Sequence, residues 1–71
     1  MTQVEISGDH IELNKLLKFE GLVESGGQAK ALIQDGYVFV NDKECRVVRK
    51  KLVSGDVVDF NGHKMKIQSL K

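Results

Sequence analysis

The side chains able to do covalent or metal chemistry are few in this chain of 71 residues. Cys45 is the sole cysteine and His10 and His63 are the two histidines, too few for a disulfide or a four-ligand zinc site. The chain also lacks a glycine-rich dinucleotide or Walker loop, a paired-histidine metal motif and a serine nucleophile elbow. A reactive Cys45 thiolate beside Arg46 is the alternative, but a small side chain against the core is the simpler interpretation. We therefore expect a protein that is not an enzyme and that binds no metal or cofactor.

Phosphate binding is the chemistry indicated by the segment Ser-Gly-Gly-Gln-Ala-Lys, which begins at Ser25. Ser25 and Gln28 have the spacing of a capping box in which each reaches the backbone of the other, so a helix should begin here. Glycine in a first helical turn costs up to about 1 kcal/mol relative to alanine, so Gly26 and Gly27 indicate a need for space. Amides without a neighbouring Cβ can approach a phosphate closely, and Lys30 flanks the same position. The alternative is a flexible helix entry that packs closely against a preceding helix.

Positive charge is concentrated in one part of the chain, although the net charge is only +1. Residues 1–14 contain acidic side chains and no base, whereas residues 43–51, called here the basic segment, contain a single acid. Its bases are Lys43, Arg46, Arg49, Lys50 and Lys51. A run of this kind is commonly a solvated loop. If folding brings Lys15, Lys18 and Lys30 beside it, the result is a continuous basic surface suited to a polyanion.

Two amphipathic helices are predicted by apolar side chains at i, i+3 and i+4. The first spans residues 11–20, ends at Gly21 and points Lys15 and Lys18 away from its apolar stripe. The second begins at the capping box and ends at Gly36. Helices this short are marginal in isolation, so the two stripes should pack on each other and on the strands that follow.

Strands are predicted after the second helix, where the apolar pattern changes to a period of two. Segments 37–40 and 57–60 are the clearest, and residues 2–6 could form a short strand. Asn61-Gly62 is a strong hairpin signal. A two-residue loop there pairs Phe60 with His63, Asp59 with Lys64 and Val58 with Met65. We expect an α+β fold with two packed short helices followed by a small antiparallel twisted sheet, in one domain spanning residues 1–71.

Several segments match a known family in order and spacing. They are Leu13–Lys18, Gly21–Val23, Ser25–Ile33, Gly36–Asn41 and Gly55–Val58. The chain resembles the S4 RNA-binding domain, or αL motif, most strongly over residues 12–60, and in particular the small stand-alone bacterial S4-like proteins. The resemblance implies structured RNA, often ribosomal or transfer RNA, bound across the two helices and the adjacent strand loop. It also implies association with the ribosome or its assembly intermediates in the cytoplasm.

The resemblance implies RNA contacts at particular positions of this chain. These are Lys15, Lys18, Ser25, Gln28, Lys30 and the neighbourhood of Asn41. The helix start and the basic segment add Gly26, Gly27, Arg46, Arg49, Lys50 and Lys51. Many family members have Arg-Leu-Asp where this chain has Glu12-Leu13-Asn14, and Ser-Arg where it has Ser25-Gly26. Because both departures remove an arginine, we expect the basic segment to compensate.

The aromatic side chains predict how RNA is recognised. Phe19, Phe39 and Phe60 are expected in the core, which leaves Tyr37 as the one platform for a stacked base. Recognition of folded RNA through its backbone and shape follows from this. The alternative function is that of a protein-interaction adaptor docking an acidic partner through the basic segment. We expect a monomer. We also expect no membrane contact, because the longest apolar run, residues 37–40, is far shorter than the roughly 20 residues that span a bilayer.

Overall fold

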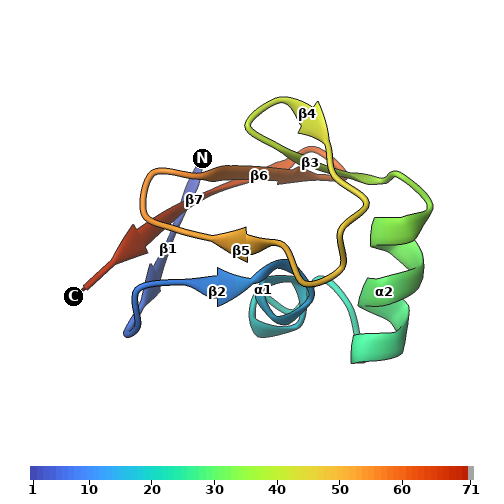
Figure 1. The fold of residues 1–71 in the computed structure, drawn as a ribbon, viewed down its shortest axis with the longest axis horizontal. Coiled ribbons are helices and arrows are strands. Elements are labelled where there is room, and N and C mark those ends of the chain that lie inside the picture. Colours follow the sequence, from blue (N-terminus) through green and yellow to red (C-terminus); the bar gives the residue numbers. More distant parts are fainter. Residues whose placement is uncertain (71) are drawn as a thin grey trace.

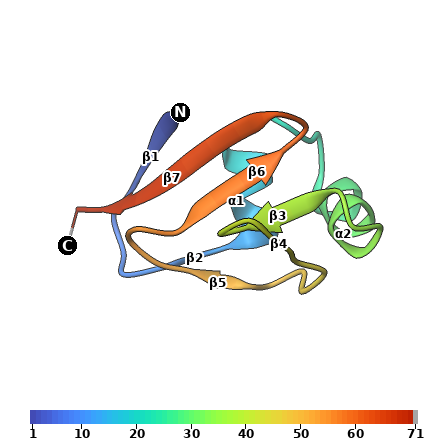
Figure 2. The ribbon, with the colours of Figure 1, turned by 90° about the horizontal axis from the view of Figure 1, so that it is seen from above.

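The computed structural model describes residues 1–70 as two α-helices, a five-stranded sheet and a separate two-stranded ribbon (Figure 1). The elements in chain order are β1 (Thr2–Ile6), β2 (Ile11–Glu12), α1 (Leu13–Phe19), α2 (Gly26–Gln34), β3 (Val38–Val40), β4 (Lys43–Glu44), β5 (Lys51–Leu52), β6 (Val57–Phe60) and β7 (His63–Ser69). Viewed from above, β1, β7, β6 and β3 lie side by side, with α1 behind them and α2 at one end (Figure 2). The expected α+β class is confirmed.

The five-stranded sheet is mixed rather than antiparallel. Its order is β1-β7-β6-β3-β4, and β1 runs parallel to β7 with Val4 beside Ile67. The expectation of strands only after the helices was therefore incomplete, because the predicted strand at residues 2–6 joins the sheet beside the last strand. A parallel pair needs a long crossover connection, and here both helices lie within it. The alternation of polar and apolar residues within a strand does not indicate which other strand it pairs with, so it could not predict the pairing of β1 with β7.

The predicted β6–β7 hairpin is confirmed in its register. Phe60 pairs with His63, Asp59 with Lys64 and Val58 with Met65. Asn61 and Gly62 have φ of 53° and 83°, the left-handed conformations that a type I′ turn requires at both central positions. The turn matches the twist of the strands, so a local signal was enough to fix the pairing of these residues.

Helix α1 is shorter than the predicted segment 11–20. Residues Ile11 and Glu12 form β2, since they pair with Leu52 and Lys51 of β5. The end of the helix is as predicted: Gly21 has φ of 71°, and the Leu22 amide donates to the Leu17 carbonyl at 3.0 Å. This is the Schellman ending that glycine favours.

The core forms where both helices meet the inner face of the sheet. Its fully buried side chains include Leu13, Leu16, Leu17, Ile33, Val38, Leu52, Val58, Met65 and Ile67. The placement of Phe19 and Phe39 in the core was wrong, because these side chains are 66% and 40% exposed, and Phe60 is only partly buried against the core. Phe19 lies beside the apolar stripe of α1, and Phe39 alternates with the buried Val38 and Val40. Among residues 1–70, no helix has the length and apolar character needed to cross a bilayer.

Asn41 joins two turns. It has φ of 52°, its side-chain amide donates to Asp56 Oδ1 at 3.1 Å, and its Oδ1 accepts from the Val57 amide at 2.9 Å. Asp56 Oδ2 in turn accepts from the Val53 amide at 2.9 Å. The turn after β3 is thereby fixed to the turn before β6.

We predict that Asn41→Ala lowers the free energy of unfolding by about 2–3 kcal/mol, because it strains a left-handed residue and removes two hydrogen bonds. Asn61→Ala is the matched control, since Asn61 has φ of 53° and its side chain makes no hydrogen bond within residues 1–70. Asn61→Ala should lower the free energy of unfolding by about 1 kcal/mol, the cost of placing alanine in the left-handed conformation. Urea denaturation measures both values, and equal losses would contradict the bridging role of Asn41.

Candidate functional site

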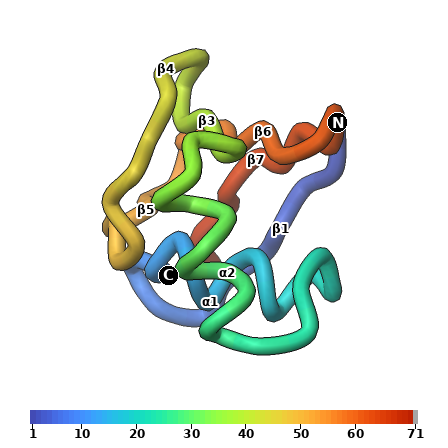
Figure 3. The backbone as a smooth tube through the Cα atoms, turned by 90° about the vertical axis from the view of Figure 1, so that its right-hand side faces the viewer, coloured from blue at the N-terminus to red at the C-terminus, as the bar shows by residue number. Residues whose placement is uncertain are grey.

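A hollow of about 400 Å³ lies where the starts of α1 and α2 meet the basic segment. We call it the α2 hollow, and its lining residues are Asn14, Gly26, Gly27, Lys30, Val48 and Arg49. In the tube view, the chain between β4 and β5 descends from the sheet to the start of α1, with α2 in front (Figure 3). Three segments singled out in the sequence therefore meet at this hollow.

The start of α2 is built by the predicted capping box. Ser25 Oγ accepts from the Gln28 amide at 3.1 Å, and the Gln28 side chain accepts from the Glu24 amide at 2.7 Å. The Gln28 side chain was expected to bond to the Ser25 backbone, but it accepts from the preceding residue, Glu24. Because the first amides of a helix have no partner within it, the amides of Gly26 and Gly27 are free to bind a ligand.

The two glycines do not serve close packing. A Cβ built at Gly26 would have no heavy atom within 4 Å, and one built at Gly27 would meet only Ser25 Oγ, at 3.9 Å. Both residues are exposed. The alternative that glycine is needed for packing against α1 is therefore contradicted, and the open space above these amides faces solvent and the α2 hollow.

The basic segment is fixed to α1 by its backbone. The Leu13 amide donates to the Lys50 carbonyl at 2.9 Å, and the Asn14 amide donates to the Val48 carbonyl at 3.1 Å. Arg49 lies between these two anchored carbonyls and lines the hollow with Lys30. Neither cation takes part in an ion pair within the described part of the chain. The hollow thus combines two free positive charges with free helix amides, an arrangement that binds phosphate.

Asn14 is a site residue that the sequence reading missed. Its Oδ1 is buried and has no hydrogen-bond partner among residues 1–70. The side chain lines the α2 hollow, so the site includes a polar group with one hydrogen bond unmade. A signal was present: about 60° separates Asn14 from Leu17 around the helix, which places a polar residue at the border of the apolar stripe.

Lys15 and Lys18 lie next to the α2 hollow on the exposed face of α1. They line a neighbouring hollow with Ile11 and Phe19. The exposed Lys15 forms an ion pair with the half-buried Glu12, with 3.3 Å between Nζ and Oε1.

The remaining predicted site residues lie elsewhere. Arg46 Nε donates to Glu44 at 2.8 Å and its Nη1 donates to the Gln34 carbonyl at 3.3 Å, at the opposite end of α2. Lys50 lines a different hollow with Arg46 and Asn41, and Lys51 pairs with Glu12 across the β2–β5 ribbon. The basic segment is thus divided, and Arg49 is its contribution to the α2 hollow.

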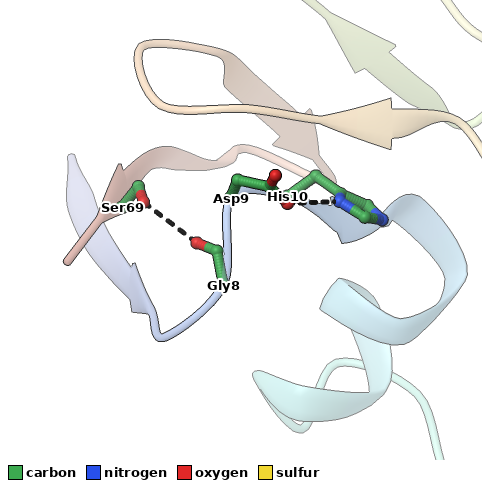
Figure 4. A network of polar contacts seen from close by, with 4 residues as sticks. All are labelled: Gly8, Asp9, His10 and Ser69. Atoms are coloured by element: carbon green, nitrogen blue, oxygen red, sulfur yellow. Dashed lines mark hydrogen bonds and ion pairs between the residues drawn. The ribbon is translucent and has the colours of Figure 1, made fainter. Parts of the chain in front are cut away.

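His10 has a structural explanation. Its Nδ1 lies 2.8 Å from Asp9 Oδ1, and nearby the Ser69 hydroxyl donates to the Gly8 carbonyl at 2.9 Å (Figure 4). The hydrogen bond from His10, and secondarily the charge of its ring, hold the pKa of Asp9 below its ordinary value. Within residues 1–70, no three His, Cys, Asp or Glu side chains gather to hold a metal ion. This corner therefore organises the loop after β1.

Comparisons with known proteins point to one family. Residues 4–68 match the model of an S4 domain. "Putative RNA-binding protein YbcJ" of Escherichia coli is 45% identical over 58 residues, which cover 82% of this chain and 83% of that protein. "Probable ribosome maturation protein RlbA" of Bacillus subtilis is 36% identical over 59 residues, 83% of either chain. The solution structure of E. coli YbcJ, titled as revealing an αL motif involved in RNA binding, matches with a TM-score of 0.71 at 39% identity, covering 96% of this chain and 87% of that one.

We predict that Asn14→Leu raises the free energy of unfolding by about 1 kcal/mol, because it removes a buried oxygen left without a partner. The control Gln34→Leu replaces an exposed amide on α2 and should change stability by no more than about 0.5 kcal/mol. Urea denaturation provides the comparison. A clear loss of stability in Asn14→Leu would mean that the amide already satisfies its bonds in the free protein.

Proposed function

Since this chain belongs to the S4 domain family, we propose that it binds RNA and that the α2 hollow receives the RNA backbone. The observation that carries the proposal is the convergence of free amides at Gly26 and Gly27, the unpaired cations of Lys30 and Arg49, and the unpartnered oxygen of Asn14. The family membership also confirms the resemblance noted in the sequence and the expectation that the chain is not an enzyme.

Each group in the α2 hollow has a distinct part in this proposal. A phosphate at the start of α2 accepts from the glycine amides, and the helix dipole favours its charge. Lys30 and Arg49 neutralise that phosphate and its neighbour, with the arginine able to donate two parallel bonds. The Asn14 side chain supplies a polar wall to the same hollow. Lys15 and Lys18 continue the positive surface along α1.

For the target, we propose structured ribosomal RNA in the cytoplasm, in the ribosome or in particles being assembled. The name of the B. subtilis relative, "Probable ribosome maturation protein RlbA", supports this choice. The size of the α2 hollow supports it as well, because a site of this kind positions a folded RNA through a few phosphates and cannot enclose a long single strand.

Salt dependence is the first test of the proposal. With about four phosphates neutralised by Lys15, Lys18, Lys30 and Arg49, the log–log salt slope should be near −3 to −4, a loss of roughly a hundredfold between 50 and 200 mM salt. Lys30→Glu and Arg49→Glu should each weaken binding and reduce the slope by about 1. Fluorescence anisotropy with a labelled ribosomal RNA fragment measures these values.

Lys66→Glu is the matched control for that series. Lys66 is exposed in β7, where it alternates with the buried Met65 and Ile67 and so lies on the face of the sheet away from the helices. The same reversal of charge there should have a much smaller effect. A complex insensitive to salt, or equal losses in all three variants, would contradict the α2 hollow as the binding site.

Ribosome association is tested separately, by sedimentation of lysates from cells expressing tagged protein. We expect the wild-type protein to move with ribosomal particles or their precursors, and the double variant Lys30→Glu/Arg49→Glu to stay at the top of the gradient. Crosslinking and sequencing then identify the bound RNA. Recovery of RNAs unrelated to the ribosome would reject the target while leaving RNA binding itself in place.

A further inference from the structure

Phe19 is an exposed aromatic ring that the fold does not use. It is the last residue of α1 and its side chain is 66% exposed. The ring lies between two hollows, one of about 410 Å³ shared with Ile11, Lys15 and Lys18, and one of about 350 Å³ that includes Leu70. A ring of this size at the surface of a small domain is a candidate contact for a partner.

The position of Phe19 connects it to the α2 hollow. At 100° per residue, Lys18 lies about 40°, Lys15 about 100° and Phe19 about 140° around α1 from Asn14. The two lysines therefore stand between the α2 hollow and the ring. The rise from Asn14 to Phe19 is about 7.5 Å, a short step for an extended nucleotide chain. A strand that leaves the hollow along this face meets two cations and then an aromatic surface.

The charges beside Phe19 favour a polyanion. Lys18 has no ion-pair partner in the described chain, and Lys15, whose side chain is 71% exposed, can turn from the half-buried Glu12 toward a phosphate. The hollow of about 470 Å³ lined by Tyr37, Phe39 and Phe60 differs, since it includes the carboxylate of Asp59 and no cation. Glu5 lies in the hollow that Phe19 shares with Leu70, so the side of the ring that faces Lys15 and Lys18 is the one with the composition of a nucleic-acid contact.

We propose that Phe19 is a stacking platform for an unpaired nucleobase of the bound RNA, with Lys15 and Lys18 holding the flanking phosphates. This inference rests on the proposed function and extends it: recognition then includes an unpaired base as well as the backbone of folded RNA. Every base presents a flat face to a ring, so the contact selects unpaired nucleotides without selecting a sequence.

The test uses a stem-loop oligoribonucleotide with 2-aminopurine in an adenine loop, and a blunt duplex of the same stem. Phe19→Ala should weaken binding of the stem-loop by about tenfold and abolish the quenching of 2-aminopurine, while the salt slope stays unchanged because no charge is removed. Phe19→Leu should behave in the same way, since it keeps an apolar side chain but lacks a ring. Phe19→Tyr should retain both affinity and quenching, and binding of the duplex should be equal in all variants.

Failure of this inference is distinguishable from failure of the proposed function. If Phe19→Ala and Phe19→Leu bind the stem-loop as the wild type does while Lys30→Glu binds more weakly, the stacking site is rejected and RNA binding stands. If Lys30→Glu also binds normally, both are rejected. If sedimentation shows that Phe19→Ala converts a dimer to a monomer, the ring belongs to a protein interface and the inference is overturned. The exposed ring contributes little to folding, and thermal unfolding of each variant verifies this.

Discussion

The candidate site depends on two backbone hydrogen bonds at the start of α1. Helix α1 begins without a side-chain cap, and its first amides, those of Leu13 and Asn14, donate instead to the carbonyls of Lys50 and Val48. These bonds satisfy helix amides that would otherwise lack partners, and they hold a segment rich in positive charge against the helix. Arg49 is thereby placed in the α2 hollow together with Lys30. The bonds use only main-chain atoms, so the side chain of Arg49 remains available for a ligand.

An element of the fold could be predicted from the sequence where the residues that determine it lie close together along the chain. Ser25, Gln28 and Gly36 lie within or beside one helix and fixed the bounds of α2, and Asn61-Gly62 fixed the register of the β6–β7 hairpin. The parallel pairing of β1 with β7 and the β2–β5 ribbon join residues distant in sequence, so no local pattern specified them. Such pairings depend on which surfaces remain to be covered once the rest of the chain has folded.

The same reasoning applies to the site. The bases of residues 43–51 look equivalent along the sequence, but the chain turns within them, so that Arg46 lies at the end of α2 and Arg49 at its beginning. Asn14 was missed because a buried acceptor without a partner can be recognised only once its surroundings are known. Phe19 was assigned to the core because an aromatic side chain in a helix usually packs inside, whereas its angle around α1 turns it outward. The residue type of Phe19 favoured a buried position, but its place around the helix exposes it.

The adjacency of the first and last strands has a consequence for how the molecule acquires its shape. Thr2 aligns with Met65 and Ile6 with Ser69, so the edge strand β1 cannot be placed until β7 is available. Val4 and Ile6 are buried in the folded protein, so β1 adds its part of the core only when it joins β7. A contact between residues so far apart in sequence raises the contact order, which makes folding slow relative to a helical bundle of equal length. The pairing of β1 with β7 is therefore the step that completes the native sheet.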